Sequence, residues 1–205
     1  MPIVFLSPST QDWNPYVTGS GSEEYWMNRI VDAMEPYLRS NGIRYRRNDP
    51  DTSAAAAIRE ANSGYYDFYL ALHSNAIGNG SAQTSARGII AFYYPGSAGG
   101  QRGAELIAKN LREIYPLPDK VTTRPTTALG EVSRSRFPAV LVEIGYHDNY
   151  SDALWLESHV EDVARQLVKA LTEYFDLPFI PPMDPKRGKV RLSYGTLNLR
   201  STPSP

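Results

Sequence analysis

The stretch DFYLALHSNA (residues 67–76) places a continuous apolar run, Phe68–Leu72, directly before a histidine, His73. A short continuous apolar run indicates a β-strand that is buried on both faces, as in a parallel sheet. The runs IVFL (3–6) and PAVLVEI (138–144) have the same character. The three runs predict central strands of one sheet, and His73 lies at the carboxyl end of one of them.

Helical periodicity alternates with these strands along the chain. Apolar residues recur at helical spacing over 22–40, 52–63, 98–114 and 151–175, and further strand-like segments lie at 43–47 and 88–94. Asn41-Gly42 is expected to end the first helix, and Pro36 is expected to kink or restart it. The alternation predicts an α/β fold, a single layered domain with a mainly parallel twisted sheet flanked by helices.

The C-terminal tail differs from the rest of the chain. Residues 177–188 contain four prolines and are predicted to form a linker. Residues 189–205 alternate like a short β-rich segment and are too short to fold alone. The main domain is therefore expected to span residues 1–176.

Composition excludes several classes of function. The chain has 205 residues with Lys+Arg 21 and Asp+Glu 22, so it lacks the long-range field that gathers nucleic acid or anionic membranes. No segment approaches the roughly 18 apolar residues of a transmembrane helix, and the N-terminus has no basic region typical of a signal peptide. Because cysteine is absent, any bound metal has to use His, Asp or Glu.

Several potential metal ligands are predicted to meet at the carboxyl ends of the central strands. His73 and Glu143 each lie at or near the carboxyl end of a buried strand, and in parallel strands these ends share an edge. His147 follows in the turn after the last strand, and Glu23 and Glu24 open the first helix. Two histidines with two or three carboxylates are the donor set of a catalytic zinc site, in which three protein ligands leave one position for water.

Each of these residues also has a purely structural explanation. His73 alone is explained as a hydrogen-bonded core histidine, and His147 as a turn residue. Glu143 is explained by pairing with Arg134 or Arg136. The metal site is favoured because the histidines and carboxylates are expected at the same edge.

Glu23 and Glu24 are distinguished by helical phase. Counting back four residues from Met27, which belongs to the apolar face, gives Glu23. Glu23 is therefore the preferred inward carboxylate and Glu24 is the alternative. Glu23 also fits a capping-box pattern that begins at Ser20 and needs no metal.

Four motifs resemble the zinc-dependent N-acetylmuramoyl-L-alanine amidases of the Amidase_3 type. They are IVFLSPSTQ, SEEYWMNRI, LALHSNA and PAVLVEIGYHDN, and the resemblance covers residues 1–176. It implies that Glu23 and His73 are zinc ligands and that Glu143 polarises the attacking water. It also implies that Asn75, two residues after the histidine, shapes the substrate site.

The chain departs from this family at its first zinc histidine. Pro8 aligns with the family's proline, which puts Thr10 or Gln11 at the histidine position, and neither is a good zinc ligand. His147 stands where the family usually has leucine, and we predict that it supplies the missing imidazole. The alternative is weak ligation by Gln11 or Asp12, or a degraded metal site.

The resemblance implies a peptidoglycan hydrolase that cleaves the amide bond between N-acetylmuramic acid and L-alanine of the stem peptide. Two alternatives are a wall-binding protein of the same fold with impaired catalysis, and a zinc carboxypeptidase acting on the stem peptide. The expected partner is peptidoglycan, the expected location is extracellular or in the cell wall, and a monomer is expected. Residues 189–205 resemble the start of a bacterial SH3-like module.

Overall fold

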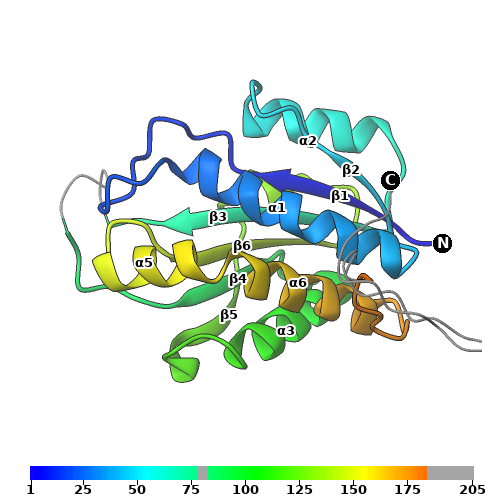
Figure 1. The fold of residues 1–205 in the computed structure, drawn as a ribbon. Coiled ribbons are helices and arrows are strands. Elements are labelled where there is room, and N and C mark those ends of the chain that lie inside the picture. Colours follow the sequence, from blue (N-terminus) through cyan, green and yellow to red (C-terminus); the bar gives the residue numbers. More distant parts are fainter. Residues whose placement is uncertain (78–82, 184–205) are drawn as a thin grey trace, which may run out of the picture.

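The computed structural model describes residues 1–77 and 83–183, in which strands and helices alternate (Figure 1). The strands are β1 (Ile3–Pro8), β2 (Arg44–Arg47), β3 (Phe68–Asn75), β4 (Ile89–Tyr93), β5 (Val121–Pro125) and β6 (Ala139–Tyr146). The helices are α1 (Glu23–Ser40), α2 (Ala54–Ser63), α3 (Ala98–Arg112), α4 (Gly130–Ser133), α5 (Tyr150–Ser158) and α6 (Val160–Tyr174), with a 3-10 turn η1 (Pro118–Lys120).

The strands form a single six-stranded sheet in the order β2-β1-β3-β6-β4-β5. Every neighbouring pair is parallel except β4 and β6, which are antiparallel. The predicted α/β fold with a mainly parallel sheet is therefore confirmed. Because β3 and β6 are parallel neighbours in the middle of the sheet, their carboxyl ends lie side by side.

Helices cover both faces of the sheet (Figure 1). α1, α3 and α6 pack on one face, where Leu70 and Leu72 of β3 join the larger core cluster. α2 and α4 pack on the other face, against Tyr69 and Ala71. Because side chains alternate along a strand, His73 follows Ala71 onto the α2–α4 face.

Helix α1 has the boundaries that its sequence predicts. The Ser22 hydroxyl accepts a hydrogen bond from the Tyr25 amide, and Gly42 adopts a φ of +64° just beyond the C-terminus. The expected restart at Pro36 does not occur, since one helix spans the proline. The carbonyl that loses its partner belongs to Asp32, which is exposed, so water can satisfy it.

The structure contains elements that periodicity did not predict. Between α3 and β6 the sequence predicted only a connection, yet η1, β5 and α4 lie there. β5 is an edge strand with the sequence VTTRP, which lacks an apolar run. The last helix, expected to be continuous over 151–175, is divided at His159, where the Ser158 hydroxyl bonds to main-chain carbonyls one turn earlier.

The start of the predicted linker packs against the end of α1. The Asn41 side chain donates to the Ile180 carbonyl at 2.9 Å and accepts from the Ile180 amide at 2.6 Å. The rest of the predicted linker and the whole SH3-like segment, residues 184–205, lie outside the described residues. Within 1–77 and 83–183, no helix combines the length and apolar character that crossing a membrane requires.

Close packing of α3 on the sheet gives a first prediction. A Cβ at Gly103 would lie 2.6 Å from ring atoms of Phe68, which is fully buried. Glycine-to-alanine changes inside helices ordinarily stabilise by about 1 kcal/mol, but overpacking a core costs about 1–3 kcal/mol. We expect Gly103→Ala to lower the free energy of unfolding by about 1 kcal/mol or more, as measured by urea denaturation.

The control is Gln101→Ala on the exposed side of the same helix, which should change stability by less than about 0.5 kcal/mol. A Gly103→Ala protein that is more stable than the wild type would contradict the close contact between α3 and β3.

Candidate active site

Three neighbouring strands place polar side chains on the α2–α4 face at one edge of the sheet. Ser7 lies near the end of β1, His73 near the end of β3 and Glu143 near the end of β6. His73 and Glu143 are register partners in the parallel β3–β6 pair. The two side chains therefore lie next to each other on the same face.

The His73 imidazole lies between two carboxylates. Its Nδ1 is 2.8 Å from Oε1 of Glu23, and its Nε2 is 2.8 Å from Oε2 of Glu131. Both glutamates are almost completely buried, with 2% of Glu23 and 5% of Glu131 exposed. The ring is thus held from both sides by groups that accept hydrogen bonds.

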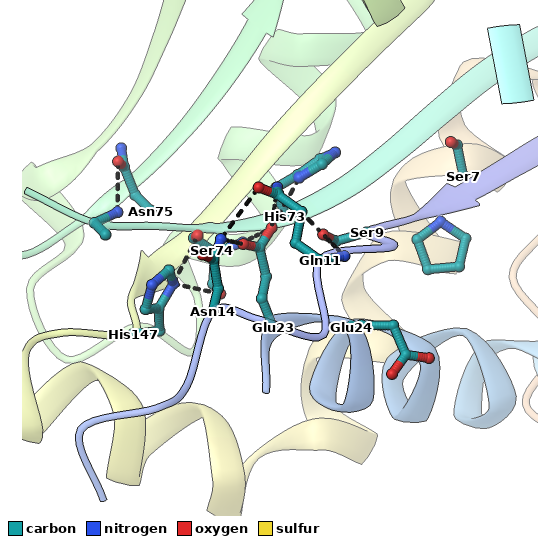
Figure 2. A network of polar contacts seen from close by, with 12 residues as sticks. Ser7, Ser9, Gln11, Asn14, Glu23, Glu24, His73, Ser74, Asn75 and His147 are labelled. Atoms are coloured by element: carbon teal, nitrogen blue, oxygen red, sulfur yellow. Dashed lines mark hydrogen bonds and ion pairs between the residues drawn. The ribbon is translucent and has the colours of Figure 1, made fainter. Parts of the chain in front are cut away.

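Glu23 reaches His73 from the first turn of α1 (Figure 2). It also accepts hydrogen bonds from Asn14 Nδ2 at 2.8 Å and Gln11 Nε2 at 3.4 Å, both from the loop after β1. Glu24 points away from His73 in Figure 2 and accepts from the Asn28 side chain. The helical phase that favoured Glu23 over Glu24 therefore agrees with the direction of the two side chains.

Glu131, which no pattern in the sequence indicated, reaches His73 from α4. Its Oε1 accepts hydrogen bonds from the Ser7 hydroxyl at 2.6 Å and the Tyr69 hydroxyl at 2.8 Å. α4 has only four residues, so no periodicity marks it in the sequence. The sequence contains only an indirect indication of it. Both ring nitrogens of a histidine at a strand end need a hydrogen-bond partner, and Glu23 accounts for only one of them.

Hydrogen bonding decides the charges in this cluster. Burial lowers the pKa of His73, but the hydrogen bonds and charges of Glu131 and Glu23 raise it well above the ordinary value of 6.5. Burial raises the pKa of both glutamates, but the contacts with His73 bring each of them below its ordinary value. Without a metal, the cluster is therefore an imidazolium between two carboxylates at neutral pH.

Glu143 behaves differently from the other two glutamates. Its Oε2 is buried and has no hydrogen-bond partner within the described residues. Burial raises its pKa to about 7, while the His73 charge opposes that rise and the charges of Glu23 and Glu131 add to it. Glu143 also lines a cavity of about 410 Å³ together with His73, Glu131 and Arg134.

His147 and Asn75 lie in contacts of their own. The His147 Nδ1 is 3.1 Å from the Ser74 hydroxyl and 2.9 Å from the Ser74 carbonyl, and its ring stacks on Tyr16. The Asn75 side chain accepts a hydrogen bond from the amide of Ala76. The structure therefore brings together Glu23, His73 and Glu143, and it does not place His147 or Asn75 among them.

The cluster provides two of the three predicted metal ligands. Glu23 and His73 present an oxygen and a nitrogen 2.8 Å apart, which are donors that zinc uses in proteins. Across residues 1–77 and 83–183, however, no group of three or more His, Asp or Glu side chains is arranged to hold a metal ion. Glu23 and His73 thus offer donors of the types that zinc uses, and the described residues place no third ligand beside them.

The fold is shared with solved bacterial amidases. The structure of N-acetylmuramoyl-L-alanine amidase AmiC2 of Nostoc punctiforme matches with a TM-score of 0.74 and 16% identity, over 85% of this chain and 97% of that one. The catalytic domain of CwlV, an N-acetylmuramoyl-L-alanine amidase from Bacillus (Paenibacillus) polymyxa var. colistinus, matches with a TM-score of 0.73 and 17% identity, over 87% of this chain and 100% of that one.

Sequence similarity agrees with the fold. The chain is 28% identical over 170 residues to N-acetylmuramoyl-L-alanine amidase LytC of Bacillus subtilis (strain 168), which covers 80% of this chain but only 34% of that protein. The family of N-acetylmuramoyl-L-alanine amidases, Amidase_3, matches residues 10–173. Because this match includes most of the domain and every residue of the His73 cluster except Ser7, the chain belongs to the Amidase_3 family.

Proposed function

We propose that this chain is a peptidoglycan hydrolase that cleaves the amide bond between N-acetylmuramic acid and L-alanine of the stem peptide. The observation that carries this proposal is Glu143, a half-buried side chain that lines the cavity beside His73 and whose Oε2 is buried with no hydrogen-bond partner among the described residues. Membership of the Amidase_3 family supports the choice of bond. A protein with this substrate would act at the cell wall, and we propose that location.

Glu143 is suited to move protons during this hydrolysis. A general base works best when its pKa lies near the working pH, and burial raises the pKa of Glu143 to about 7. Glu143 accepts a proton from the water that attacks the amide carbon, and it then gives the proton to the departing amine of L-alanine. The C–N bond breaks as the new C–O bond is made, so one water molecule is consumed for each bond that is cut.

Zinc is the metal that we propose for this site. Glu23 and His73 would hold it, and His147 stays the predicted third ligand, with Gln11 or Asp12 as the alternatives. When bound, zinc supplies a Lewis acid that acidifies water and polarises the amide carbonyl. For His147 to join the pair, its ring has to move from its contacts with Ser74 and Tyr16.

One observation favours a second candidate, a wall-binding protein with impaired catalysis. Both nitrogens of His73 already face carboxylates, and the described residues hold no complete set of metal ligands. If the imidazolium between Glu23 and Glu131 is the working state of the protein, the cluster is structural. In that case the chain binds peptidoglycan, through Asn75 or other residues, without cutting it.

The first test compares Glu143→Gln with the wild type on purified muropeptides in the presence of zinc. We expect the wild type to release the intact stem peptide, seen by mass spectrometry, and Glu143→Gln to be about 10²- to 10⁴-fold slower, because a general base contributes that factor. Zinc content per chain, measured by atomic emission, should stay the same. Glu24→Gln is the matched control, since Glu24 points away from His73, and it should retain activity.

Other results would rule out parts of this proposal. Full activity in Glu143→Gln with unchanged zinc content would remove Glu143 from the mechanism. Loss of a terminal amino acid from the stem peptide would identify a carboxypeptidase instead. A wild type that binds sacculi but neither binds zinc nor releases peptide would identify the wall-binding protein.

Removal of zinc gives a separate prediction. Treatment of the active protein with a chelator should abolish release of the stem peptide, and added zinc should restore it, because three protein ligands and a labile position typify catalytic zinc. The measurement is the rate of peptide release before chelation, after it and after zinc is returned. Activity that persists at undetectable zinc content would contradict the proposed metal.

The raised pKa of Glu143 also predicts how stability depends on pH in the metal-free protein. The folded state binds this proton more tightly than the unfolded state, whose value is 4.5. Stability from Glu143 is therefore fully present below pH 4.5 and is lost as the pH rises through about 7. A pKa shift from 4.5 to about 7 corresponds to a contribution of about 3 kcal/mol to the free energy of unfolding. Glu143→Gln has no ionisable group at this position, so its stability lacks this pH-dependent contribution.

The measurement is urea denaturation of both proteins at pH 5 and pH 8 in the presence of a chelator. The other titrating groups affect both proteins equally, so they cancel in the difference between the two free energies of unfolding. From pH 5 to pH 8 the wild type should lose stability relative to Glu143→Gln. If the two proteins differ in stability by the same amount at both pH values, the raised pKa that follows from the buried, unpartnered Oε2 of Glu143 would be contradicted.

A further inference from the structure

We propose that Arg134 is a specificity-determining residue that binds a free carboxylate of the stem peptide close to the bond that is cut. The preferred substrate is therefore a stem peptide whose second residue keeps its carboxylate, rather than one in which this group is an amide. This inference rests on the proposed function, because it takes Glu143 as the group beside the cut bond.

The cavity beside His73 and Glu143 has a permanently charged cation in its wall. The described lining includes apolar side chains, among them Ile58 and Leu141. Arg134 is the one lysine or arginine among the described residues that line it. A few polar groups in a partly apolar cavity are what fixes the orientation of a bound ligand.

The Arg134 side chain folds back along α4 to the wall of this cavity. A Cβ at Gly130, which also lines the cavity, would lie 3.9 Å from both Cδ and Nε of Arg134 and 3.4 Å from Cδ1 of Ile58. The Arg134 amide donates to the Gly130 carbonyl, and the Arg134 carbonyl accepts from the Asn62 side chain at 2.9 Å. The main chain therefore holds the start of this side chain in place beside the cavity.

The charge of Arg134 is not used inside the protein. Across residues 1–77 and 83–183 its guanidinium forms no ion pair and no hydrogen bond, whereas Arg46, Arg87 and Arg102 each bind a carboxylate. An arginine without a partner at the wall of a cavity is available to a ligand that enters the cavity. Arg134 is exposed, so its guanidinium meets such a ligand without first leaving a buried contact.

Arg134 does not neutralise Glu143 either, although the sequence allowed that pairing. The charges that act on the pKa of Glu143 are those of His73, Glu23 and Glu131. In the metal-free protein the imidazolium of His73 balances only one of the two ionised glutamates, so this cluster is net negative. An anionic peptide is therefore repelled by the cluster unless a cation outside it offsets the charge.

A carboxylate is the ligand that a guanidinium binds best. The two groups form two parallel hydrogen bonds, whereas a primary amide offers one acceptor oxygen and no charge. The second residue of the stem peptide is D-glutamate linked through its γ-carboxyl, so its α-carboxyl group is either free or an amide. One residue spans at most about 3.6 Å, so this group lies within about 7 Å of the cut bond. A cavity of about 410 Å³ can hold a fragment of this length.

The test compares two muropeptides that differ only in this group. N-acetylmuramoyl-L-alanyl-D-glutamate has the free α-carboxylate, and N-acetylmuramoyl-L-alanyl-D-isoglutamine has an amide in its place. Calorimetric titration in the presence of a chelator gives both dissociation constants, and mass spectrometry checks that the peptides stay intact. We expect the wild type to bind the carboxylate form about 10-fold more tightly, because a hydrogen bond to a charged group typically contributes that factor.

Two substitutions of Arg134 should change this preference in different ways. Arg134→Gln should bind both peptides with similar affinity, because the bidentate contact and the charge are lost. Arg134→Glu should reverse the preference, because its carboxylate repels the free carboxylate of the peptide. Both variants should fold, as checked by circular dichroism, since substitutions at exposed positions usually change stability little.

The matched control is Arg136→Gln, which removes the same charge two residues further along the chain. The Arg136 guanidinium donates to the Asn62 carbonyl at 3.1 Å, and Arg136 lines a separate cavity with Tyr65 and Phe137. This variant should keep the preference of the wild type. If Arg136→Gln loses the preference as fully as Arg134→Gln does, the net charge of the protein is the cause and the inference is overturned.

The remaining outcomes separate this inference from the proposed function. A wild type that binds both peptides equally, or binds neither, would overturn the role of Arg134, as would an unchanged preference in Arg134→Gln. With zinc added, the preference should appear in KM rather than kcat, because the contact is made before the bond is cut. A wild type that releases no peptide, yet shows a preference that Arg134→Gln lacks, would refute the hydrolysis and support binding by Arg134.

Discussion

The site depends on one imidazole that is shared by two buried carboxylates. Without His73, the charges of Glu23 and Glu131 would be buried and uncompensated, and each would cost several kcal/mol. With it, α1 and α4 are both tied to the end of β3 by hydrogen bonds of 2.8 Å, across sequence separations of 50 and 58 residues. The same hydrogen bonds hold the imidazole in one orientation, with each ring nitrogen facing a buried carboxylate.

Three glutamates close to one histidine have two different protonation behaviours, and the cause is hydrogen bonding. Glu23 and Glu131 each receive several hydrogen bonds and stay ionised, whereas Glu143 has a buried oxygen to which none of the described residues donates, and a pKa of about 7. Neighbouring groups whose pKa values are pushed apart are typical of acid–base sites. The sheet places Glu143 beside His73 through the strand register, at a position where none of the described residues donates a hydrogen bond to its Oε2.

The sequence predicted elements and side-chain directions correctly wherever a regular hydrophobic pattern related a residue to the core. The apolar runs located β1, β3 and β6, and the spacing from Met27 gave the inward direction of Glu23. Glu131 could not be found in this way, because a helix of four residues has no period and its contacts depend on folding of the whole sheet. β5 escaped notice for a related reason, since an edge strand with little apolar burial carries no run of hydrophobic residues.

His147 shows why the edge of a sheet is not enough to define a site. The sequence correctly predicted that His147 lies near the carboxyl ends of the central strands. A sheet has two faces, however, and the alternation of side chains fixes the face only for residues within a strand. Glu143 lies within β6 and shares the face of His73. His147 follows the last residue of β6, and it stacks on Tyr16, which belongs to the core on the α1–α6 side. The face of a residue beyond a strand end is decided by packing, and here the contacts with Ser74 and Tyr16 set the direction of the His147 imidazole.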